Sequence, residues 1–245
     1  MANNFWELLK PDWTKFPKLE TDQRDNVAPP PLQKEYPAGA ELIDLVAPDL
    51  FSIGNLSFRK VIGLRKSRRK YQSWSLSLEE LSYLLWATQG IKQDQPQNKR
   101  TVPSGGNRHP FETYLFISNV KGIKPGLYRY LPFDHKLLFI RNTSQLADEV
   151  AEACLGNQFV REAAALVVWT AIPYRTEWRY GPLSYKLVAI DAGHICQNLY
   201  LASESIGYGT CAIAAYDQQK WDELLKIDGV KEFTIYMAPV GKVDP

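Results

Sequence analysis

The chain has 245 residues, of which 45% are hydrophobic and 23% are charged, and its net charge at pH 7 is +2. These values are typical of a globular protein, and the balanced charge argues against a large cationic surface for nucleic acid or an acidic membrane. No apolar run approaches the roughly 20 residues that span a bilayer.

Cysteine and histidine are scarce. The three cysteines, Cys154, Cys196 and Cys211, are odd in number and widely spaced, which predicts buried, reduced thiols and no disulfide framework. The three histidines lack the H-x-x-x-H spacing of a zinc site, so we expect no metal. The first residues show no signal-peptide pattern. These features together predict a cytoplasmic protein.

Residues 1–57 are predicted to form a distinct N-terminal arm. Six of the sixteen prolines lie before position 40, which favours an irregular, extended chain. The segment is too aromatic for a disordered tail, with Trp6, Trp13 and Phe16 among its residues. We therefore expect the arm to pack on a core formed by a second region, residues 58–245.

Helices and strands are predicted from hydrophobic spacing and from capping residues. Ser77 and Glu80 form a capping-box pattern at the start of a helix that ends at Gly90, and Asp217 is expected to cap a short helix through Leu225. Further helices are expected over residues 58–63, 144–155 and 187–206. Strands are expected over residues 112–117, 126–130, 136–140, 163–171 and 233–240. A polar loop is expected over residues 92–99.

Two parts of this pattern allow more than one interpretation. Residues 174–182 interleave large aromatics with arginines in a segment predicted to be irregular. It is interpreted as a substrate lid, a stacking wall or a partner surface. Near the start of the long helix, Asp191 and His194 are spaced i, i+3. A structural hydrogen bond between them is favoured over a catalytic dyad, because no nucleophile pattern accompanies the pair.

A basic run, Leu64–Tyr71, holds five cations in eight residues. Guanidinium groups match phosphate oxygens, and Ser67 adds a hydroxyl donor, so the run is interpreted either as a phosphate site or as a solvated basic face.

A proline–glycine loop, Arg100–Pro110, cannot be regular helix or strand, because prolines restrict both of its ends while Gly105 and Gly106 permit positive φ. Converging backbone N–H groups in such a turn can bind an anion or a ring carbonyl, although an ordinary surface loop is equally compatible.

A second glycine-rich segment, Gly207–Tyr216, has only two glycines and is not the G-x-G-x-x-G pattern, which argues against a Rossmann dinucleotide site. Its small residues are consistent with close approach of the backbone to a flat ligand.

Taken in order, these segments resemble the nitroreductase superfamily. Its Arg-x-Ser-x-Arg/Lys motif is matched by Arg65, Ser67 and Arg69. Its Pro-Ser-x-x-Asn-x-x-Pro motif is matched by Pro103, Ser104, Asn107 and Pro110. Residues 189–194 and 207–211 are similar to the family's Ala-Gly-His helix and the glycine segment that follows it. His109 replaces the usual glutamine, and this Arg-His-Pro form, like residues 78–87, is similar to the SagB-type oxidoreductases. The similarity covers roughly residues 58–242.

The resemblance implies an α+β fold with a central, mostly antiparallel sheet flanked by helices. It also implies an intertwined homodimer with FMN at the interface. Arg65 and Ser67 would hold the FMN phosphate, with Lys66 and Lys242 nearby, and Arg69 would lie at the pyrimidine edge. The other subunit would supply Pro103, Ser104, Gly105 and Gly106, with Asn107 fixing the ring. Ala214 and Ala215 would offer backbone N–H groups to the flavin.

The implied function is an FMN-dependent oxidoreductase that works by ping-pong hydride transfer through flavin N5, with NAD(P)H or the organic substrate as donor. An alternative is an azoline dehydrogenase acting on ribosomal peptides, in which a Lys-Tyr pair is implicated. The nearest pairs here are Arg179-Tyr180 and Tyr185-Lys186, neither of them a clean match. Candidate catalytic residues are therefore Tyr180, Tyr185 and Lys186, and Tyr128 and Trp178 are expected to line the pocket. A third hypothesis is a non-catalytic flavin-binding protein.

Overall fold

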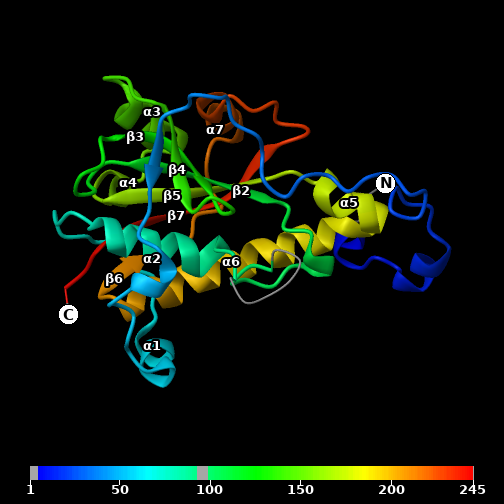
Figure 1. The fold of residues 1–245 in the computed structure, drawn as a ribbon, viewed down its shortest axis with the longest axis horizontal. Helices are drawn as coiled ribbons and strands as arrows, with labels where there is room; N and C mark the ends of the chain where they lie inside the picture. Colours follow the sequence, from blue (N-terminus) through cyan, green and yellow to red (C-terminus); the bar gives the residue numbers. More distant parts are fainter. Residues whose placement is uncertain (1–4, 93–98, 245) are drawn as a thin grey trace.

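In the computed structural model of the chain, which describes residues 5–92 and 99–244, seven strands form one sheet flanked by helices (Figure 1). The strand order is β1-β4-β3-β2-β5-β7-β6, and every neighbouring pair is antiparallel. The strands are β1 (Leu42–Asp44), β2 (Phe111–Ile117), β3 (Gly126–Leu131), β4 (Lys136–Arg141), β5 (Ala165–Ala171), β6 (Tyr208–Thr210) and β7 (Phe233–Lys242). The predicted α+β fold with an antiparallel sheet is confirmed.

The helices differ widely in length, from one turn to 22 residues. The α-helices are α1 (Phe58–Leu64), α2 (Leu78–Gln89), α3 (Leu146–Ala153), α4 (Gln158–Arg161), α5 (Tyr174–Tyr180), α6 (Ser184–Ser205) and α7 (Gln218–Leu225). Short 3₁₀ helices are η1 (Phe5–Leu9), η2 (Trp13–Lys18), η3 (Pro48–Leu50), η4 (Gly105–Asn107) and η5 (Gly181–Leu183). Within the described ranges, none of these helices has the length and apolar character needed to cross a membrane.

The sheet is covered on both faces. α2 and α6 pack on one face, and α3, α4 and α7 pack on the other (Figure 1). Strand β5 shows how its sequence serves both cores, because Val167 and Trp169 belong to the first and Leu166 and Val168 to the second. Side chains alternate across a strand, so a strand buried on both faces is continuously apolar.

The predicted capping residues are confirmed. Ser77 Oγ accepts from the backbone N–H of Glu80 at 3.2 Å, and the Glu80 carboxylate accepts in return from the N–H of Ser77 at 2.7 Å. Asp217 accepts from the N–H of Lys220 at 3.1 Å and so begins α7. These caps satisfy backbone donors that the first helical turn leaves without partners.

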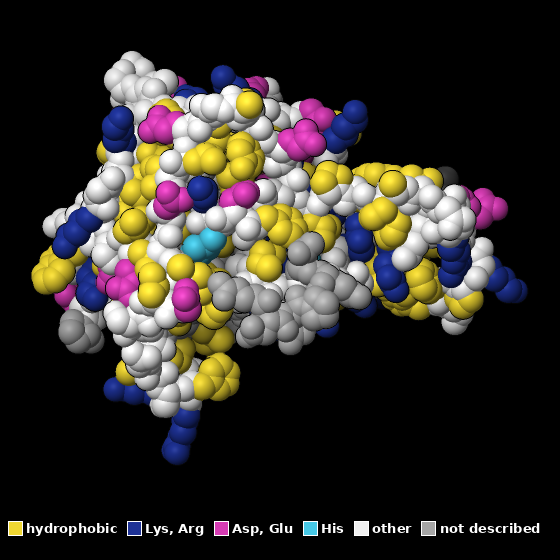
Figure 2. All heavy atoms as spheres, in the orientation of Figure 1, with side chains coloured by type: hydrophobic (Ala, Val, Ile, Leu, Met, Phe, Trp, Pro, Cys, Tyr) yellow, Lys and Arg dark blue, Asp and Glu magenta, His cyan; other side chains and the backbone are white. Residues whose placement is uncertain are grey.

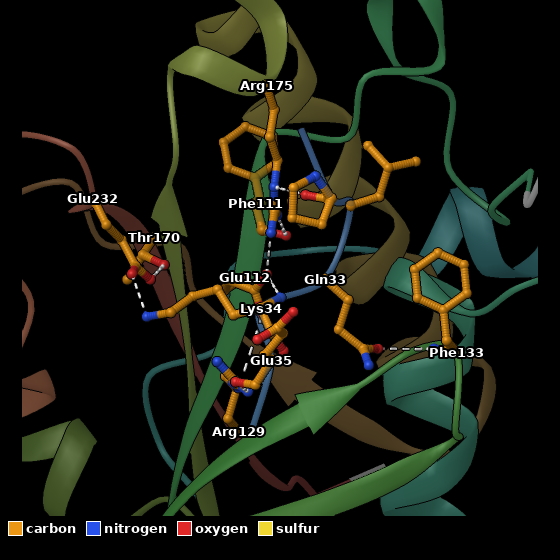
Figure 3. Close-up of polar contacts among 12 residues, drawn as sticks. Gln33, Lys34, Glu35, Phe111, Glu112, Arg129, Phe133, Thr170, Arg175 and Glu232 are labelled. Carbon is orange, nitrogen blue, oxygen red and sulfur yellow. Dashed lines mark hydrogen bonds and ion pairs between the residues drawn. The ribbon is translucent and has the colours of Figure 1, made fainter. Parts of the chain in front are cut away.

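The arm segment Pro31–Glu35 lies against buried charges of the sheet and α5 (Figure 3). Its carbonyl groups accept hydrogen bonds from three buried guanidinium groups, those of Arg100, Arg129 and Arg175, at 2.6 to 3.0 Å. The N–H of Lys34 donates to Glu112 at 2.9 Å, and the Lys34 ammonium pairs with Glu232. A buried cation without acceptors is costly, so this part of the arm stabilises the interior of the fold.

Three local features differ from the prediction. Residues 174–180 form helix α5 instead of an irregular segment, because the arm and the proline–glycine loop hold them from two sides, as described below. The short elements β1, α4 and β6 were not predicted, since each spans only three or four residues. Helix α3 is shorter at both ends than expected. Residues 93–98 of the predicted polar loop lie outside the described residues.

Candidate functional site

The basic run is extended where it follows α1. Ser67 forms a parallel bridge with Thr210 of β6, and the N–H of Arg68 donates to the carbonyl of Thr210 at 2.9 Å. Successive side chains of an extended chain point to opposite sides. An extended chain thus accounts for the common side of Arg65 and Ser67, both of which contact Tyr200 of α6.

Arg68 points toward the interior of the protein, whereas its cationic neighbours in the run form no ion pair with a described carboxylate. Its guanidinium donates to Glu204 of α6 at 2.8 Å, in a pair that is largely buried. In the part of the chain that the structure describes, the ion pairs involve none of Arg65, Lys66 and Arg69. The exposed side of the run therefore has the charge and the donors of an anion site.

Tyr200 of α6 connects the basic run to the second glycine-rich segment. Its hydroxyl lies 3.0 Å from Ser67 Oγ and accepts from the N–H of Ala212 at 2.8 Å, while the guanidinium of Arg65 lies 5.5 Å from its ring centroid. Sequence reasoning missed this residue. Its only sequence signal is its place on the long helix shortly before Gly207.

Lys242 lies beside the end of the basic run, because the N–H of Gln72, the residue after the run, donates to its carbonyl at 2.8 Å. It pairs with Tyr208 in the β6–β7 ladder, and its ammonium lies 4.6 Å from the Tyr208 ring centroid. The neighbouring glycines serve packing within the chain. A Cβ at Gly209 would come within 2.4 Å of the Arg68 side chain, so this small residue makes room for Arg68 rather than for a flat ligand.

The proline–glycine loop is fixed to the first half of α6 by Asp191. Its carboxylate accepts from Ser104 Oγ at 2.6 Å and from the N–H of Gly105 at 3.1 Å. Ser104 Oγ in turn accepts from the N–H of His109 at 2.9 Å. Gly106 has φ 61°, which confirms the expected positive φ in this turn.

His109 completes this network from inside the protein. Its Nε2 lies 2.9 Å from Oδ1 of Asn107, and the ring is almost fully buried. Burial, together with the charges of Arg100, Arg108 and Arg175, lowers the pKa of His109 to about 3. The ring is therefore neutral at physiological pH and acts as a hydrogen-bonding partner of Asn107.

Asp191 and His194 do not form the hydrogen bond that their spacing favoured. His194 Nδ1 lies 3.8 Å from the nearer carboxylate oxygen, beyond hydrogen-bond distance. Burial raises the pKa of Asp191, although the bonds from Ser104 and Gly105 act in the opposite direction. The carboxylate of Asp191 therefore accepts hydrogen bonds from the loop and not from the neighbouring histidine.

The remaining predicted residues lie in different surroundings. Ala214 and Ala215 are exposed directly after Ile213, which bridges to Met237 of β7. The Tyr180 hydroxyl packs on Gly106 of the proline–glycine loop. Tyr185 is exposed on the first turn of α6, beside the half-buried Lys186, and it lines an apolar cavity of about 630 Å³ with Tyr174, Val230 and Phe233.

Two of the expected pocket residues are part of the interior. Tyr128 belongs to the core under α2 and α6, and its hydroxyl donates to the carbonyl of Lys124 at 2.7 Å, so its prediction as a pocket residue is wrong. Trp178 is buried beneath the guanidinium of Arg108, which lies 4.6 Å from its ring centroid.

Within one chain, the basic run and the proline–glycine loop are attached to different parts of α6. Asp191 holds the loop, whereas Tyr200 and Glu204 hold the run. A helix rises 1.5 Å per residue, so these attachment points are separated by roughly 14 to 20 Å. The structure thus assembles two clusters, one cationic and one built from a fixed loop.

Comparisons with known proteins identify the family. A family profile described as the nitroreductase family matches residues 62–242. The chain belongs to the nitroreductase family. A protein of Methanocaldococcus jannaschii named as a candidate nitroreductase is 32% identical over 202 residues, which cover 82% of this chain and 98% of that protein. Membership of the nitroreductase family indicates an oxidoreductase.

Two further relatives are matched over part of their length. A crystal structure of a candidate nitroreductase from Anabaena variabilis has a TM-score of 0.70 and 27% identity, over 84% of this chain and 42% of that one. The trifolitoxin-processing protein TfxB of Rhizobium leguminosarum bv. trifolii is 34% identical over 113 residues, which cover 44% of this chain and 30% of TfxB. The chain thus spans less than half of the length of each of these two proteins.

Proposed function

We propose that this nitroreductase-family protein is an FMN-dependent oxidoreductase. The observation that supports the proposal most directly is the basic run beside β6, in which Arg65 and Ser67 both contact Tyr200 and no carboxylate among the described residues pairs with Arg65 or Arg69. A phosphate is the natural occupant of such a set, because guanidinium and hydroxyl donors match its oxygens.

The remaining residues fit the flavin ring. The proline–glycine loop has a left-handed Gly106 and a hydrogen-bonded Asn107, so its backbone is held in one conformation. Ala214 and Ala215 are exposed two and three residues beyond Ala212, which Tyr200 anchors. When bound, FMN supplies the redox chemistry, and the protein supplies binding, orientation and electrostatics.

Each cluster then has a separate role. Arg65, Ser67 and Lys242 bind the phosphate, and Arg69 places a cation at the pyrimidine edge of the ring, where it favours negative charge. Asp191 keeps the proline–glycine loop in position through Ser104 and Gly105. Because Ser104 Oγ donates to Asp191, its hydroxyl proton is already used within the protein.

A homodimer would bring the two clusters together. In an isologous contact along α6, the second helix runs in the opposite direction, so the loop of one chain meets the basic run of the other. Apolar surface is available for such a contact: Phe58 of α1 is 72% exposed, and a groove of about 410 Å³ between α1, α2 and α6 is lined by Leu56, Trp86 and Leu201.

Complementation tests the shared site. An Arg65→Ala chain and a Gly106→Val chain are each expected to bind FMN poorly. Mixed dimers of the two contain one site with both substitutions and one intact site. The mixture should therefore regain part of the FMN binding of the wild-type protein. If mixing restores nothing, both clusters act within one chain and the shared site is wrong.

The phosphate assignment is tested with FMN and riboflavin, which differ only in the phosphate. Wild-type protein should bind FMN more tightly than riboflavin. Arg65→Ala should weaken FMN binding by roughly 10- to 100-fold, as expected for loss of charge-assisted hydrogen bonds, and should leave riboflavin binding unchanged. Arg161→Ala removes an arginine from an exposed ion pair with Asp148 and is the matched control. A protein that binds neither flavin contradicts the proposal.

A second candidate is an azoline dehydrogenase of ribosomal peptides. The similarity to TfxB, a protein named for processing trifolitoxin, favours it. The Lys-Tyr pair expected for this chemistry is replaced by Arg179-Tyr180, in which Tyr180 packs on Gly106. Anaerobic bleaching of the bound flavin by an azoline peptide alone would support this candidate, and bleaching by NADH or NADPH would support a nicotinamide-dependent oxidoreductase. Bound flavin that no donor bleaches would indicate a non-catalytic flavin-binding protein.

A further inference from the structure

Helix α5 lies between the N-terminal arm and the proline–glycine loop. On the arm side, the ring centroids of Trp13 and Phe16 lie 5.9 and 5.5 Å from that of Tyr180. The guanidinium of Arg24 lies 5.0 Å from the Phe16 ring centroid and continues the stack. Aromatic pairs at these distances are attractive beyond the area that they bury.

Hydrogen bonds attach the arm to α5 at more than one point. The N–H of Gln23 donates to the carbonyl of Trp178, and the indole N–H of Trp178 donates to the carbonyl of Val27, both at 2.9 Å. The hydroxyl of Tyr174 donates to Asp22 at 2.5 Å. The arm segment 12–27 therefore contacts both the first and the last turn of α5.

Helix α5 also packs on the proline–glycine loop. A Cβ placed on Gly106 would lie 2.5 Å from the Tyr180 hydroxyl and 3.0 Å from Cδ of Arg179. Arg108 donates from Nε to the carbonyl of Arg175 at 2.7 Å. The left-handed turn at Gly106 is thus in direct contact with Tyr180.

Helix α5 is too short to hold this position alone. It has seven residues and ends at Gly181, whose φ is 49°. Isolated helices of this length are unstable in water, so neighbouring segments determine where α5 lies. Figure 2 shows the region of α5 and the arm as a lobe at one side of the molecule, with hydrophobic and cationic side chains on its surface.

We propose that Trp13 and Phe16 are positioning residues for the proline–glycine loop, acting through Tyr180. The arm holds Tyr180, Tyr180 holds Gly106, and the loop is thereby kept in the conformation that Asp191 fixes from the other side. Residues 12–27 lie outside the segment that matches the nitroreductase family, so this would be a feature added to the family domain. The expected effect of the arm on flavin binding rests on the proposed function, whereas its effect on the conformation of the proline–glycine loop does not.

Hydrogen exchange of the flavin-free protein tests the structural step. In Trp13→Ala/Phe16→Ala, exchange of residues 174–183 and 103–110 should become roughly tenfold faster, because two aromatic contacts are lost. Trp74→Ala/Phe133→Ala is the matched control, since it removes the same residue types from exposed positions (67% and 39%) before α2 and between β3 and β4. Faster exchange confined to the arm, with the loop unchanged, would overturn the proposal.

Tyr180→Ala provides an independent variant that leaves the arm sequence intact. It should accelerate exchange of residues 103–110 as much as the arm variant does, and combining the two should add little, because both break the same chain of contacts. Fully additive effects on the loop would show that the arm does not act through Tyr180 and would contradict the proposal.

Flavin binding provides the functional measurement. The arm variant should weaken FMN and riboflavin binding by the same factor and alter the visible circular dichroism of the bound flavin, because the ring environment changes and the phosphate site does not. A loss restricted to FMN would place the effect at the phosphate and contradict the proposal. If the wild-type protein binds no flavin, the proposed function fails, and the exchange result still decides whether the arm positions the loop.

Discussion

Replacing Asp191 with alanine should damage flavin binding through the proline–glycine loop. The carboxylate accepts from Ser104 Oγ at 2.6 Å and from the N–H of Gly105 at 3.1 Å, and Ser104 Oγ accepts from the N–H of His109. Removing the carboxylate leaves a half-buried hydroxyl and a backbone N–H without their acceptor. The conformation of the whole turn therefore depends on one side chain of α6.

The expected magnitude follows from the two bonds and the burial. A hydrogen bond to a charged group contributes about 1.5–3 kcal/mol. Burial raises the pKa of Asp191, so part of that gain is offset by the cost of keeping the carboxylate buried, and the expected loss in free energy of unfolding is about 2 kcal/mol. Asp191→Asn retains one acceptor oxygen and should lose roughly half as much.

Urea unfolding of the flavin-free protein and equilibrium binding of FMN measure the two effects. The control is Asp222→Ala, which removes another buried aspartate that accepts from a backbone N–H, that of Thr234 at 2.8 Å, away from both clusters. Both variants should lose stability, and only Asp191→Ala should lose FMN affinity, by about tenfold or more. Equal FMN affinity in wild type and Asp191→Ala would refute the reasoning.

Three further predictions concern residues around the loop and the arm. Because the pKa of His109 is lowered to about 3, the unfolded state binds more protons below neutral pH, so the free energy of unfolding should fall as pH drops from 7 toward 3, by up to about 1 kcal/mol per pH unit. His109→Gln should flatten this dependence in urea titrations, and an unchanged slope would contradict it. Glu112→Gln leaves the buried Arg175 without its carboxylate and should cost about 3–5 kcal/mol, against less than about 1 kcal/mol for Asp148→Asn in an exposed pair. Gly106→Ala combines a positive φ with a contact of 2.5 Å to Tyr180 and should lower the melting temperature; a melting temperature equal to that of Gly63→Ala, where a Cβ meets nothing within 4 Å, would argue against the close contact.

Local signals in the sequence predicted much of the framework. The capping box at Ser77 and the continuous apolar run of β5 are short-range patterns, and both are confirmed. The Arg-x-Ser-x-Arg spacing is also local, because an extended chain alone places its first, third and fifth residues on one side. Such patterns predict elements and site residues without knowledge of the tertiary structure.

Long-range contacts account for what the sequence did not predict. Asp191 has a nearby histidine at i, i+3, yet its partners are Ser104 and Gly105, more than 80 positions away in the chain. Residues 174–180 form helix α5 although they were predicted to be irregular. Their order comes from contacts with the arm and with the proline–glycine loop, which the local sequence pattern does not show. Tyr200 has no motif at all, and only its contacts with Ser67 and Ala212 show its importance.

Anaerobic titration of the FMN-loaded protein tests the central claim most directly. NADH, NADPH and an azoline peptide would each be added while the visible absorbance of the flavin is followed, and a quinone would then be added as acceptor. We expect that the protein retains FMN through gel filtration, that at least one donor bleaches it faster than free FMN, and that the quinone restores the absorbance. A protein that retains no FMN, or whose bound flavin no donor bleaches faster than free FMN, would contradict an FMN-dependent oxidoreductase.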